Sequence, residues 1–246
     1  EVLFEGKNIL TLPEQEKREI RGKKIAIIFQ DPQSALNPVL TIGYQVSESL
    51  IVHKIAKKRE AYREAEKLLS VVGISDAGLR MKNYPHEFSG GMKQRAVIAT
   101  SISCKPEILI ADEPTTALDV TVQSQVLKVI TELVEKNKMS LIFISHDIAL
   151  VSLISTKICV MYAGWIVEEG ETKSIINNPL HPYTVALLGS LPRPGVKIKP
   201  ISGSPLDISN TGCKFAKRCP SVKRQCFEII PENTKKNGRM VKCLLY

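Results

Sequence analysis

The sequence predicts an α/β fold in which helices cover a parallel sheet. Three short apolar runs rich in Ile are bounded by polar residues and are typical of buried strands: Lys24–Phe29, Ile108–Ala111 and Leu141–Ser145. Between the second and third runs lies Val120–Lys136, where apolar residues recur at helical spacing. A strand, a helix and a strand in direct succession predict a βαβ unit, whose two strands are parallel.

A charged helical segment interrupts this pattern. Lys57–Val72 is a charged amphipathic helix with its small and apolar residues on one side. It lies within residues 43–87, which we interpret as a helical subdomain inserted into the core. The core itself is then made of residues 1–42 and 88–191.

The last part of the chain differs in composition from the core. Ile158–Ile166, interrupted by Gly164, still predicts a hairpin at the margin of the sheet. After it, residues 192–246 are expected to form a separate extension. This extension begins with a linker marked by four prolines, Pro192, Pro194, Pro200 and Pro205.

The net charge of +9 is distributed unevenly over the 246 residues. Residues 1–195 contain 23 basic and 22 acidic side chains, whereas residues 196–246 contain 11 basic and 3 acidic ones. A composition of 43% apolar and 24% charged residues is typical of globular proteins, and excludes disordered and collagen-like classes. No apolar run approaches the ~18 residues that span a bilayer, and no signal-peptide pattern occurs near the start.

The strongest chemical signal is a pair of acids at the end of a predicted strand. Ile108–Ala111 is followed directly by Asp112 and Glu113. In a parallel sheet, the carboxyl ends of the strands form the edge where ligands bind. Asp112 can hold Mg²⁺ there, and Glu113 can polarise a water molecule. The alternative is a strand that runs into a solvated acidic turn.

Three other features lie where they would face the same edge or an anion. Ser89, Gly90 and Gly91 form a turn at a predicted helix start, where exposed N–H groups suit a phosphate. Gln30 and His146 each follow a predicted strand. Taken singly, a Ser-Gly-Gly turn is an ordinary loop and a lone Gln or His is a polar strand end.

In order and spacing, these features resemble the motifs of ABC-type ATPases. The Q-loop, signature motif, Walker B motif, D-loop and H-loop correspond to Gln30, Ser89–Gly91, Ile108–Glu113, Ala117–Asp119 and His146. Within that superfamily the chain is similar to ATP-binding subunits of oligopeptide and dipeptide importers. The segments behind this narrower similarity are Phe29–Pro32, Leu36–Pro38, Asn178–Thr184 and the terminal cysteine segment.

The resemblance implies a P-loop-NTPase-like parallel sheet and a role for each residue at its edge. Asp112 and Gln30 would hold Mg²⁺, Glu113 would act as general base, and His146 would contact the γ-phosphate of ATP. Gln30 would also report the nucleotide state to a membrane partner.

The resemblance also implies partners. Ser89, Gly90, Gly91 and Asp119 would act on ATP bound to a second, facing ATPase subunit. Residues 37–45 would receive a coupling helix from a transmembrane permease. An extracytoplasmic solute-binding protein would act indirectly, and the subunit would sit on the cytoplasmic face of the membrane.

One part of such a site is missing from the sequence. The phosphate-binding pattern is G-x-x-x-x-G-K-[ST]. The two Gly-Lys pairs, Gly6-Lys7 and Gly22-Lys23, are followed by Asn8 and Lys24, so neither fits. We therefore expect the phosphate-binding loop, with the aromatic residue that stacks on adenine, to be supplied upstream of Glu1, and the chain alone to be inactive.

Four cysteines are concentrated in the basic C-terminal segment: Cys213, Cys219, Cys226 and Cys243. In a reducing compartment such a group favours a metal over disulfides. The spacing lacks the C-x2-C pair common in zinc sites, and four thiolates on irregular loops suit an iron–sulfur cluster. Zinc and free thiols remain open. The other two cysteines, Cys104 and Cys159, are expected to be buried in the core.

The resemblance to peptide importers implies that these four cysteines ligate a 4Fe-4S cluster. The residues that match are Gly212-Cys213, Arg218-Cys219-Pro220 and Cys226. A cluster with four thiolates would have a charge of about −2. Neighbouring basic side chains are expected to offset it, namely Lys217, Arg218, Lys223 and Arg224. The fold class predicted overall is thus a parallel-sheet core, an inserted helical subdomain and a cysteine-rich metal-binding extension.

Two other functions remain open from the sequence. The basic tail could instead bind phosphate backbones in a nucleic-acid-handling ABC ATPase, although it has few aromatic residues for base stacking. The chain could also be a catalytically idle interaction module, if the phosphate-binding loop is truly absent. We favour a peptide importer and no nucleic-acid partner; the transported solute and the identity of the facing subunit are not determined by these residues.

Overall fold

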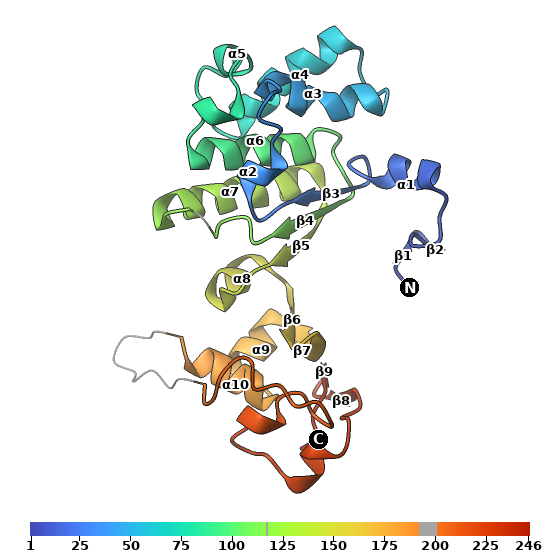
Figure 1. Cartoon of the computed structure of the whole chain (residues 1–246), viewed down its shortest axis with the longest axis vertical. Coiled ribbons are helices and arrows are strands. Elements are labelled where there is room, and N and C mark those ends of the chain that lie inside the picture. The colour runs from blue at the N-terminus through green and yellow to red at the C-terminus, as the bar shows by residue number, and fades with distance from the viewer. Residues whose placement is uncertain (117, 192–200) are drawn as a thin grey trace. The chain divides into compact units, whose positions relative to one another are not determined.

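The chain divides into two units, Glu1–His146 and Asp147–Tyr246. The computed structural model describes residues 1–116, 118–191 and 201–246 (Figure 1). Ala117 and the linker prolines Pro192, Pro194 and Pro200 lie outside the described residues. None of the described helices is long and apolar enough to cross a membrane.

The parallel sheet predicted from the Ile-rich runs is confirmed. Its strands are β3 (Ile25–Ile28), β4 (Ile108–Asp112) and β5 (Ser140–Ile144), in the order β3-β4-β5. Both pairings are parallel, with Ile28 opposite Ala111 and Asp112 opposite Ile144. Helix α7 (Val120–Asn137) connects β4 to β5, as the βαβ pattern predicts.

The two faces of this sheet differ. One face packs into a core with α6 (Gly90–Ile102) and α7, and its side chains, such as Ala26, Leu109 and Ala111, are buried. The other face is apolar and exposed, with Ile27, Ile142 and Ile144 between 40% and 50% accessible. Parallel sheets are normally covered on both faces. Within Glu1–His146, no described helix covers this second face.

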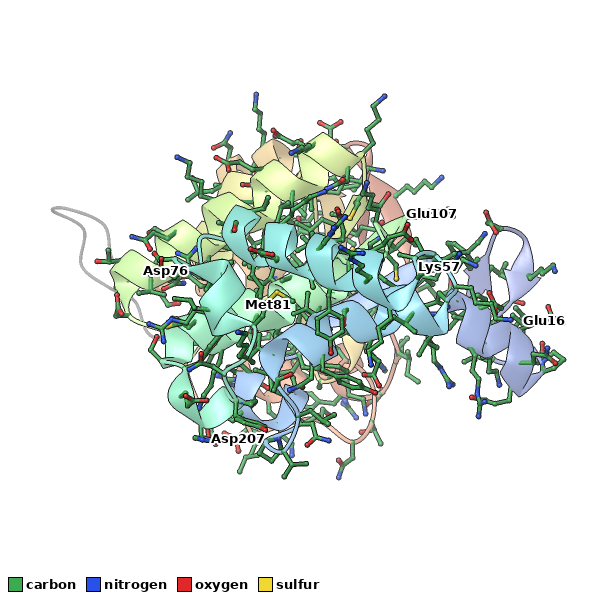
Figure 2. The ribbon with its side chains drawn as sticks, turned by 90° about the horizontal axis from the view of Figure 1, so that it is seen from above. Glu16, Lys57, Asp76, Met81, Glu107 and Asp207 are labelled. Carbon is green, nitrogen blue, oxygen red and sulfur yellow. The ribbon has the colours of Figure 1, made fainter. Side chains whose placement is uncertain are left out.

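The predicted amphipathic helix is confirmed as α4 (Lys58–Val71), whose buried side is Ala61, Ala65 and Leu69. It packs on α3 (Ile42–Val52), and both share one core cluster with the sheet. Figure 2 shows Lys57 at the start of α4 and Met81 among the neighbouring helices. The remaining short elements of this unit are β1 (Leu3–Phe4), β2 (Lys7–Asn8), α1 (Glu14–Ile20), α2 (Pro32–Ala35), α5 (Ala77–Arg80) and η1 (Pro85–Glu87).

The second unit is built on an antiparallel sheet in the order β6-β7-β9-β8. The predicted hairpin is present as β6 (Lys157–Tyr162) and β7 (Trp165–Glu171), joined by Ala163 and Gly164, which both have positive φ. Such a two-residue turn matches the twist of a hairpin. The sequence analysis places this hairpin at the margin of the parallel sheet. That prediction is wrong, because the hairpin does not extend that sheet. It forms a separate sheet with β8 (Thr234–Lys236) and β9 (Arg239–Val241).

Strand pairing also changes how the C-terminal residues are grouped. The sequence places a boundary at residue 192, but β9 pairs with β7 through Glu168 opposite Val241. The cysteine segment therefore shares a sheet with the hairpin. The other elements of this unit are α8 (Ile148–Ile154), α9 (Thr172–Asn177), α10 (Pro182–Gly189) and, within the cysteine segment, η2 (Ala216–Arg218) and η3 (Arg224–Phe227).

Phe215 anchors the cysteine segment in the core of this second unit. It is 1% exposed and packs with Tyr162 and Tyr183 at ring-centroid distances of 5.1 and 5.3 Å. Edge-to-face contacts of this kind add to the stabilisation from burial. Cys159, by contrast, is exposed, because it lies on the outer side of β6; the expectation that it is buried is wrong.

Candidate functional site

The carboxyl edge of the parallel sheet brings three predicted residues together. Gln30 follows β3, Glu113 follows β4 and His146 follows β5. Because the strands are parallel and adjacent in this order, their ends meet at one edge. The lone-residue alternatives considered from sequence do not account for this convergence.

Three side chains hold the carboxylate of Glu113. Gln30 Nε2 and Thr116 Oγ1 donate to its Oε2 at 2.9 and 2.8 Å, and His146 Nδ1 lies 3.1 Å from its Oε1. The hydrogen bonds from His146 and Thr116 lower the pKa of Glu113, so the group is ionised at neutral pH. An ionised carboxylate only accepts hydrogen bonds, so Nδ1 of His146 is the protonated nitrogen.

The backbone fixes where Glu113 points. Its N–H donates to the carbonyl of Ile144 at 2.9 Å, which continues the pairing of β4 with β5 by one residue. Its φ of 44° lies in the left-handed region, which costs about 1 kcal/mol or more for a residue other than glycine. The chain therefore turns sharply after Asp112 and is held in that turn by strand pairing.

Asp112 lies in β4 opposite Ile144 and is half-buried. Side chains alternate along a strand, so Asp112 projects on the same side as Ile110, away from the face covered by α6 and α7. Its carboxylate is an oxygen ligand of the type that Mg²⁺ prefers. The position suits a metal ion bound at the sheet edge beside Glu113.

Thr116 is the residue of this edge that the sequence analysis missed. It lies three positions after Glu113, and its hydroxyl reaches back to the carboxylate. Threonines near acids are common in turns, so no spacing rule singles this one out. Only the left-handed turn at Glu113 brings the two side chains together.

The predicted anion-binding turn begins a helix, as expected. Ser89 caps α6 by accepting from the Met92 N–H at 3.3 Å, and Asp119 caps α7 by accepting from the Val122 N–H at 3.0 Å. In the described part of the chain, neither side chain bonds to the group around Glu113. The structure thus places these residues at helix starts and not at the Glu113 site of their own chain.

The two glycines after Ser89 differ in what surrounds them. A Cβ at Gly91 would lie 3.1 Å from Val122 Cγ1, so α7 restricts this position. A Cβ at Gly90 would meet no described atom within 4 Å. Packing within the described chain therefore does not require glycine at position 90.

A tight turn precedes α3. The side chain of Gln45, which is buried, accepts from the Asn37 N–H at 2.8 Å and donates to the carbonyls of Asn37 and Leu40 at 3.0 and 2.9 Å. These bonds fix the turn from inside. Val39 at its tip is 75% exposed, which makes it an apolar contact point on the surface.

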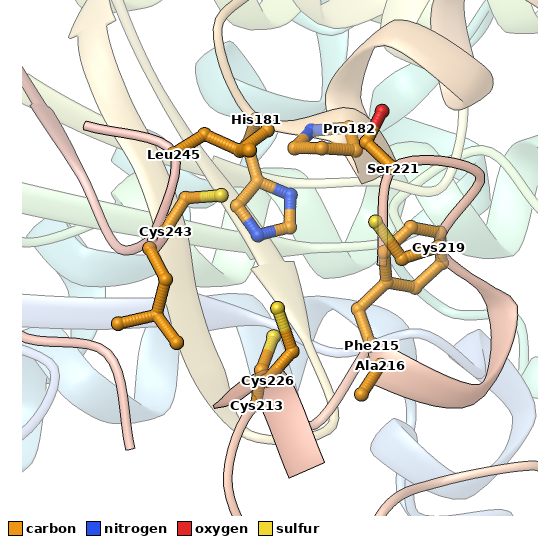
Figure 3. A pocket seen from close by; sticks show the side chains of 11 residues that line it. His181, Pro182, Cys213, Phe215, Ala216, Cys219, Ser221, Cys226, Cys243 and Leu245 are labelled. Carbon is orange, nitrogen blue, oxygen red and sulfur yellow. The ribbon is translucent and has the colours of Figure 1, made fainter. Parts of the chain in front are cut away.

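The four C-terminal cysteines line one cavity in the second unit, together with His181 and Phe215 (Figure 3). All four are free thiols; Cys226 is buried and the others are half-buried. Burial raises the pKa of Cys219 to about 11 and also raises those of Cys213 and Cys243. Each of these thiols is also affected by the charge of another cysteine of the group, so the four lie close together.

The described residues contain no group of three or more His, Cys, Asp or Glu side chains placed to hold a single metal ion. Lys223 lies close enough to Cys243 to oppose the effect of burial on its pKa. Arg224 pairs with Glu228 at 3.4 Å.

His181 is the polar residue of this cavity that the sequence analysis did not assign. It is 1% exposed, and its Nδ1 accepts from the Tyr183 N–H at 3.0 Å, which caps α10. Its Nε2 has no hydrogen-bond partner among the described residues. Burial lowers the pKa of His181 to about 4, so the ring is neutral.

A buried ion pair holds the segment that presents His181. The carboxylate of Glu168 accepts from the backbone N–H groups of Leu180 and His181 at 3.0 and 2.9 Å, and from Arg239 Nη1 at 3.2 Å. Arg239 Nη1 also donates to the carbonyls of Ser174 and Asn178 at 2.8 and 2.7 Å. Glu168 and Arg239 are 0% and 4% exposed in their side chains, so the pair is fully enclosed.

The parallel sheet, the acids at its carboxyl edge and the helix-capping glycine turn define an ABC-type ATPase. A family model described as "ABC transporter" matches residues 1–116. The chain is also similar to the ATP-binding cassette MJ0796 in a dimeric, post-hydrolysis state bound to ADP and Pi, with a TM-score of 0.61 and 25% identity over 69% of this chain and 72% of that one.

Closer relatives identify the family. A second model, described as "Oligopeptide/dipeptide transporter, C-terminal region", matches residues 167–226. The dipeptide transport ATP-binding protein DppD of Bacillus subtilis (strain 168) is 47% identical over 99% of this chain and 75% of its own length. The oligopeptide transport ATP-binding protein OppD of Salmonella typhimurium is 42% identical over 98% and 73%. The chain belongs to the oligopeptide/dipeptide transporter family of ABC ATPases.

Proposed function

We propose that this chain is part of the ATP-hydrolysing subunit of an ABC importer for peptides. The observation behind this proposal is the carboxylate of Glu113, held at the sheet edge by Gln30, Thr116 and His146. Its relatives named as dipeptide and oligopeptide transport ATP-binding proteins supply the substrate class.

In this proposal Glu113 accepts the proton of the water that attacks the γ-phosphate. The lowered pKa keeps the carboxylate ionised and ready to accept that proton. Nδ1 of His146 holds the carboxylate at 3.1 Å, which leaves Nε2 for the contact with the γ-phosphate. Asp112, with Gln30, would hold Mg²⁺, which when bound neutralises phosphate charge.

Gln30 is proposed to link the site to the membrane partner. Its amide is bonded to Glu113 at 2.9 Å, so a change at the nucleotide that moves either group also moves the other. The Gln45-braced turn at residues 37–45 follows closely in the chain and exposes Val39. We assign this turn to contact with a transmembrane permease, at the cytoplasmic face of the membrane.

The site would be completed by two elements from outside the described chain. None of the 246 residues forms the phosphate-binding pattern, so the cradle for the phosphates must come from other residues. The nucleotide opposite Ser89, Gly90, Gly91 and Asp119 would belong to a facing ATPase subunit. The open space at Gly90 supports this arrangement, because the position is free to approach another molecule.

We also propose that the four cysteines hold a 4Fe-4S cluster. Four free thiols that line one cavity are the donor set that such a cluster takes. When bound, the cluster would cross-link the loops on which these cysteines lie.

The function is tested with the full-length protein, its partner ATPase and permease in lipid vesicles. We expect hydrolysis of ATP to rise when a peptide-loaded solute-binding protein is added. A Glu132→Gln variant should show the same rise as the wild type, since this acid is exposed on α7 and, among the described residues, pairs with Lys128. Hydrolysis that responds to DNA or RNA and ignores peptide would overturn the proposal, as would a full-length protein that does not bind ATP.

A further inference from the structure

The cysteine cavity contains one buried hydrogen-bonding group that the proposed ligand set does not use. This group is the imidazole of His181, which lies among the four cysteines in the cavity (Figure 3). Its Nε2 is buried and has no partner among the described residues. Leaving such a group unsatisfied is unfavourable, so a partner inside the cavity is to be expected.

The tautomer of His181 follows from its other nitrogen. Nδ1 lies 3.0 Å from the Tyr183 N–H, which can only donate, so Nδ1 accepts and has no proton. Since an imidazole ring has at least one N–H, the proton is on Nε2. The atom that faces the cavity is therefore a donor and not a metal ligand, because ligation requires a free lone pair.

The ring is also prevented from turning away. The backbone N–H of His181 is bonded to the buried carboxylate of Glu168, and that carboxylate is locked by Arg239. The ring centroid of His181 lies 6.0 Å from that of Phe215, in the aromatic core. A donor fixed in this way needs an acceptor that is also fixed within the cavity.

The acceptor must be sought among the groups that line or fill the cavity. Apart from the exposed Ser221, which makes no hydrogen bond to Nε2 of His181 among the described residues, the other lining side chains are thiols and apolar groups, and a protonated thiol is a weak acceptor. Sulfur atoms of an iron–sulfur cluster bear negative charge and accept hydrogen bonds well.

We propose that Nε2–H of His181 donates a hydrogen bond to a sulfur of the cluster, and that His181 is a positioning residue that raises the cluster's reduction potential. This inference rests on the proposed 4Fe-4S cluster. Reduction adds negative charge to the cluster, so a donor to its sulfur favours the reduced form. The Glu168–Arg239 pair holds the donor in place from behind.

Two substitutions distinguish the effect of losing the Nε2–H donor from the effect of losing the cap of α10. His181→Asn keeps an acceptor near the position of Nδ1, and so keeps the cap of α10, but removes the donor. His181→Gln removes the cap but places an amide N–H near the position of Nε2. The full-length wild type and the two variants are purified without oxygen. Iron and sulfide content, circular dichroism and the midpoint potential from a redox titration followed by electron paramagnetic resonance are measured.

We expect all three forms to retain the cluster. His181→Asn should lower the ratio of reduced to oxidised cluster about tenfold at a fixed potential, which is about 59 mV for a one-electron couple. His181→Gln should stay near the wild type. Equal potentials in all three forms, or the same decrease in both variants, would overturn the role of the donor.

The wild type gives an independent measurement if a variant does not fold. Protein labelled with ¹⁵N-histidine should show a weak hyperfine coupling to one imidazole nitrogen in the reduced cluster. No coupling, or the strong coupling of a directly bound nitrogen, contradicts the inference. A wild-type protein that contains no iron and sulfide after anaerobic purification overturns the cluster proposal itself, and this inference with it.

Discussion

The two sites of this chain differ in how far they are enclosed. At the sheet edge, Glu113 and His146 are 22% and 71% exposed in their side chains, and their contacts come from strand ends. His181 in the cysteine cavity and Glu168, which binds its backbone N–H, are 1% and 0% exposed, and their contacts come from a folded sheet and its loops. The first arrangement suits a site that other molecules complete, and the second suits one that encloses its own ligand.

This difference separates effects on activity from effects on folding. Changes at the open edge should alter hydrolysis and leave the stability of the chain nearly unchanged, because exposed polar groups contribute little to folding. Changes at the buried Glu168–Arg239 pair should alter stability first, because these two charged groups have no access to water. A change at the open edge that mainly lowers stability, or a change at the enclosed site that mainly lowers hydrolysis, would contradict this difference.

The largest expected effect is at Glu113. Glu113→Gln keeps the size of the side chain but removes the proton acceptor, so hydrolysis by the full-length protein with its partners should fall by about 10²–10⁴-fold. ATP binding should persist. Steady-state phosphate release and equilibrium nucleotide binding check the two expectations. Retained hydrolysis would show that another group is the general base.

The next effect is on folding and concerns Glu168. Glu168→Ala leaves Arg239 buried without its partner and frees two backbone N–H groups, which should cost about 3–5 kcal/mol in the free energy of unfolding. Glu171→Ala is the matched control, because this acid is exposed on the same strand. Urea unfolding followed by fluorescence suits this test, because the single tryptophan of the sequence, Trp165, lies in β7. Equal stability of the two variants would contradict the importance of the ion pair.

The same contrast explains what the sequence could predict. Strands β3, β4 and β5 were recognisable because each contains a continuous apolar run rich in Ile, as in buried parallel strands. Gln30, Glu113 and His146 were recognisable because each lies within two residues of the end of one of those strands. Local patterns were therefore sufficient to predict much of the open edge, although Thr116 was not found.

The enclosed site could not be predicted in the same way. Glu168 and Arg239 are 71 residues apart, and charged residues in strands are usually exposed, so no local pattern marks them as a buried pair. His181 lies in the Asn178–Thr184 segment that supported the family resemblance, yet its role depends on the tautomer set by Tyr183. The pairing of β7 with β9, which joins the two segments, is a long-range contact.

A smaller effect on activity is expected at the glycine turn. Gly90→Ala adds a methyl group where no described atom lies within 4 Å, so the stability of the chain should not fall. If the facing subunit's nucleotide approaches there, hydrolysis by the assembled transporter should decrease by about 10²-fold. The comparison is with Gly91→Ala, where the methyl group meets Val122 at 3.1 Å and should affect stability as well. Full activity of Gly90→Ala in the assembled transporter would refute the shared site.

The smallest effect is expected at Thr116, and it shows how finely the open edge is arranged. Thr116→Val removes one of three hydrogen bonds to Glu113. The pKa of Glu113 should rise only toward its ordinary value, so the carboxylate remains ionised at neutral pH. The variant therefore changes how the carboxylate is positioned and not its charge. We expect kcat to fall about tenfold, or about 1.4 kcal/mol, with KM for ATP unchanged. Thr121→Val, at an exposed position on α7, should have no effect. If KM rises and kcat does not fall, Thr116 acts in binding ATP and not in holding Glu113 for the reaction.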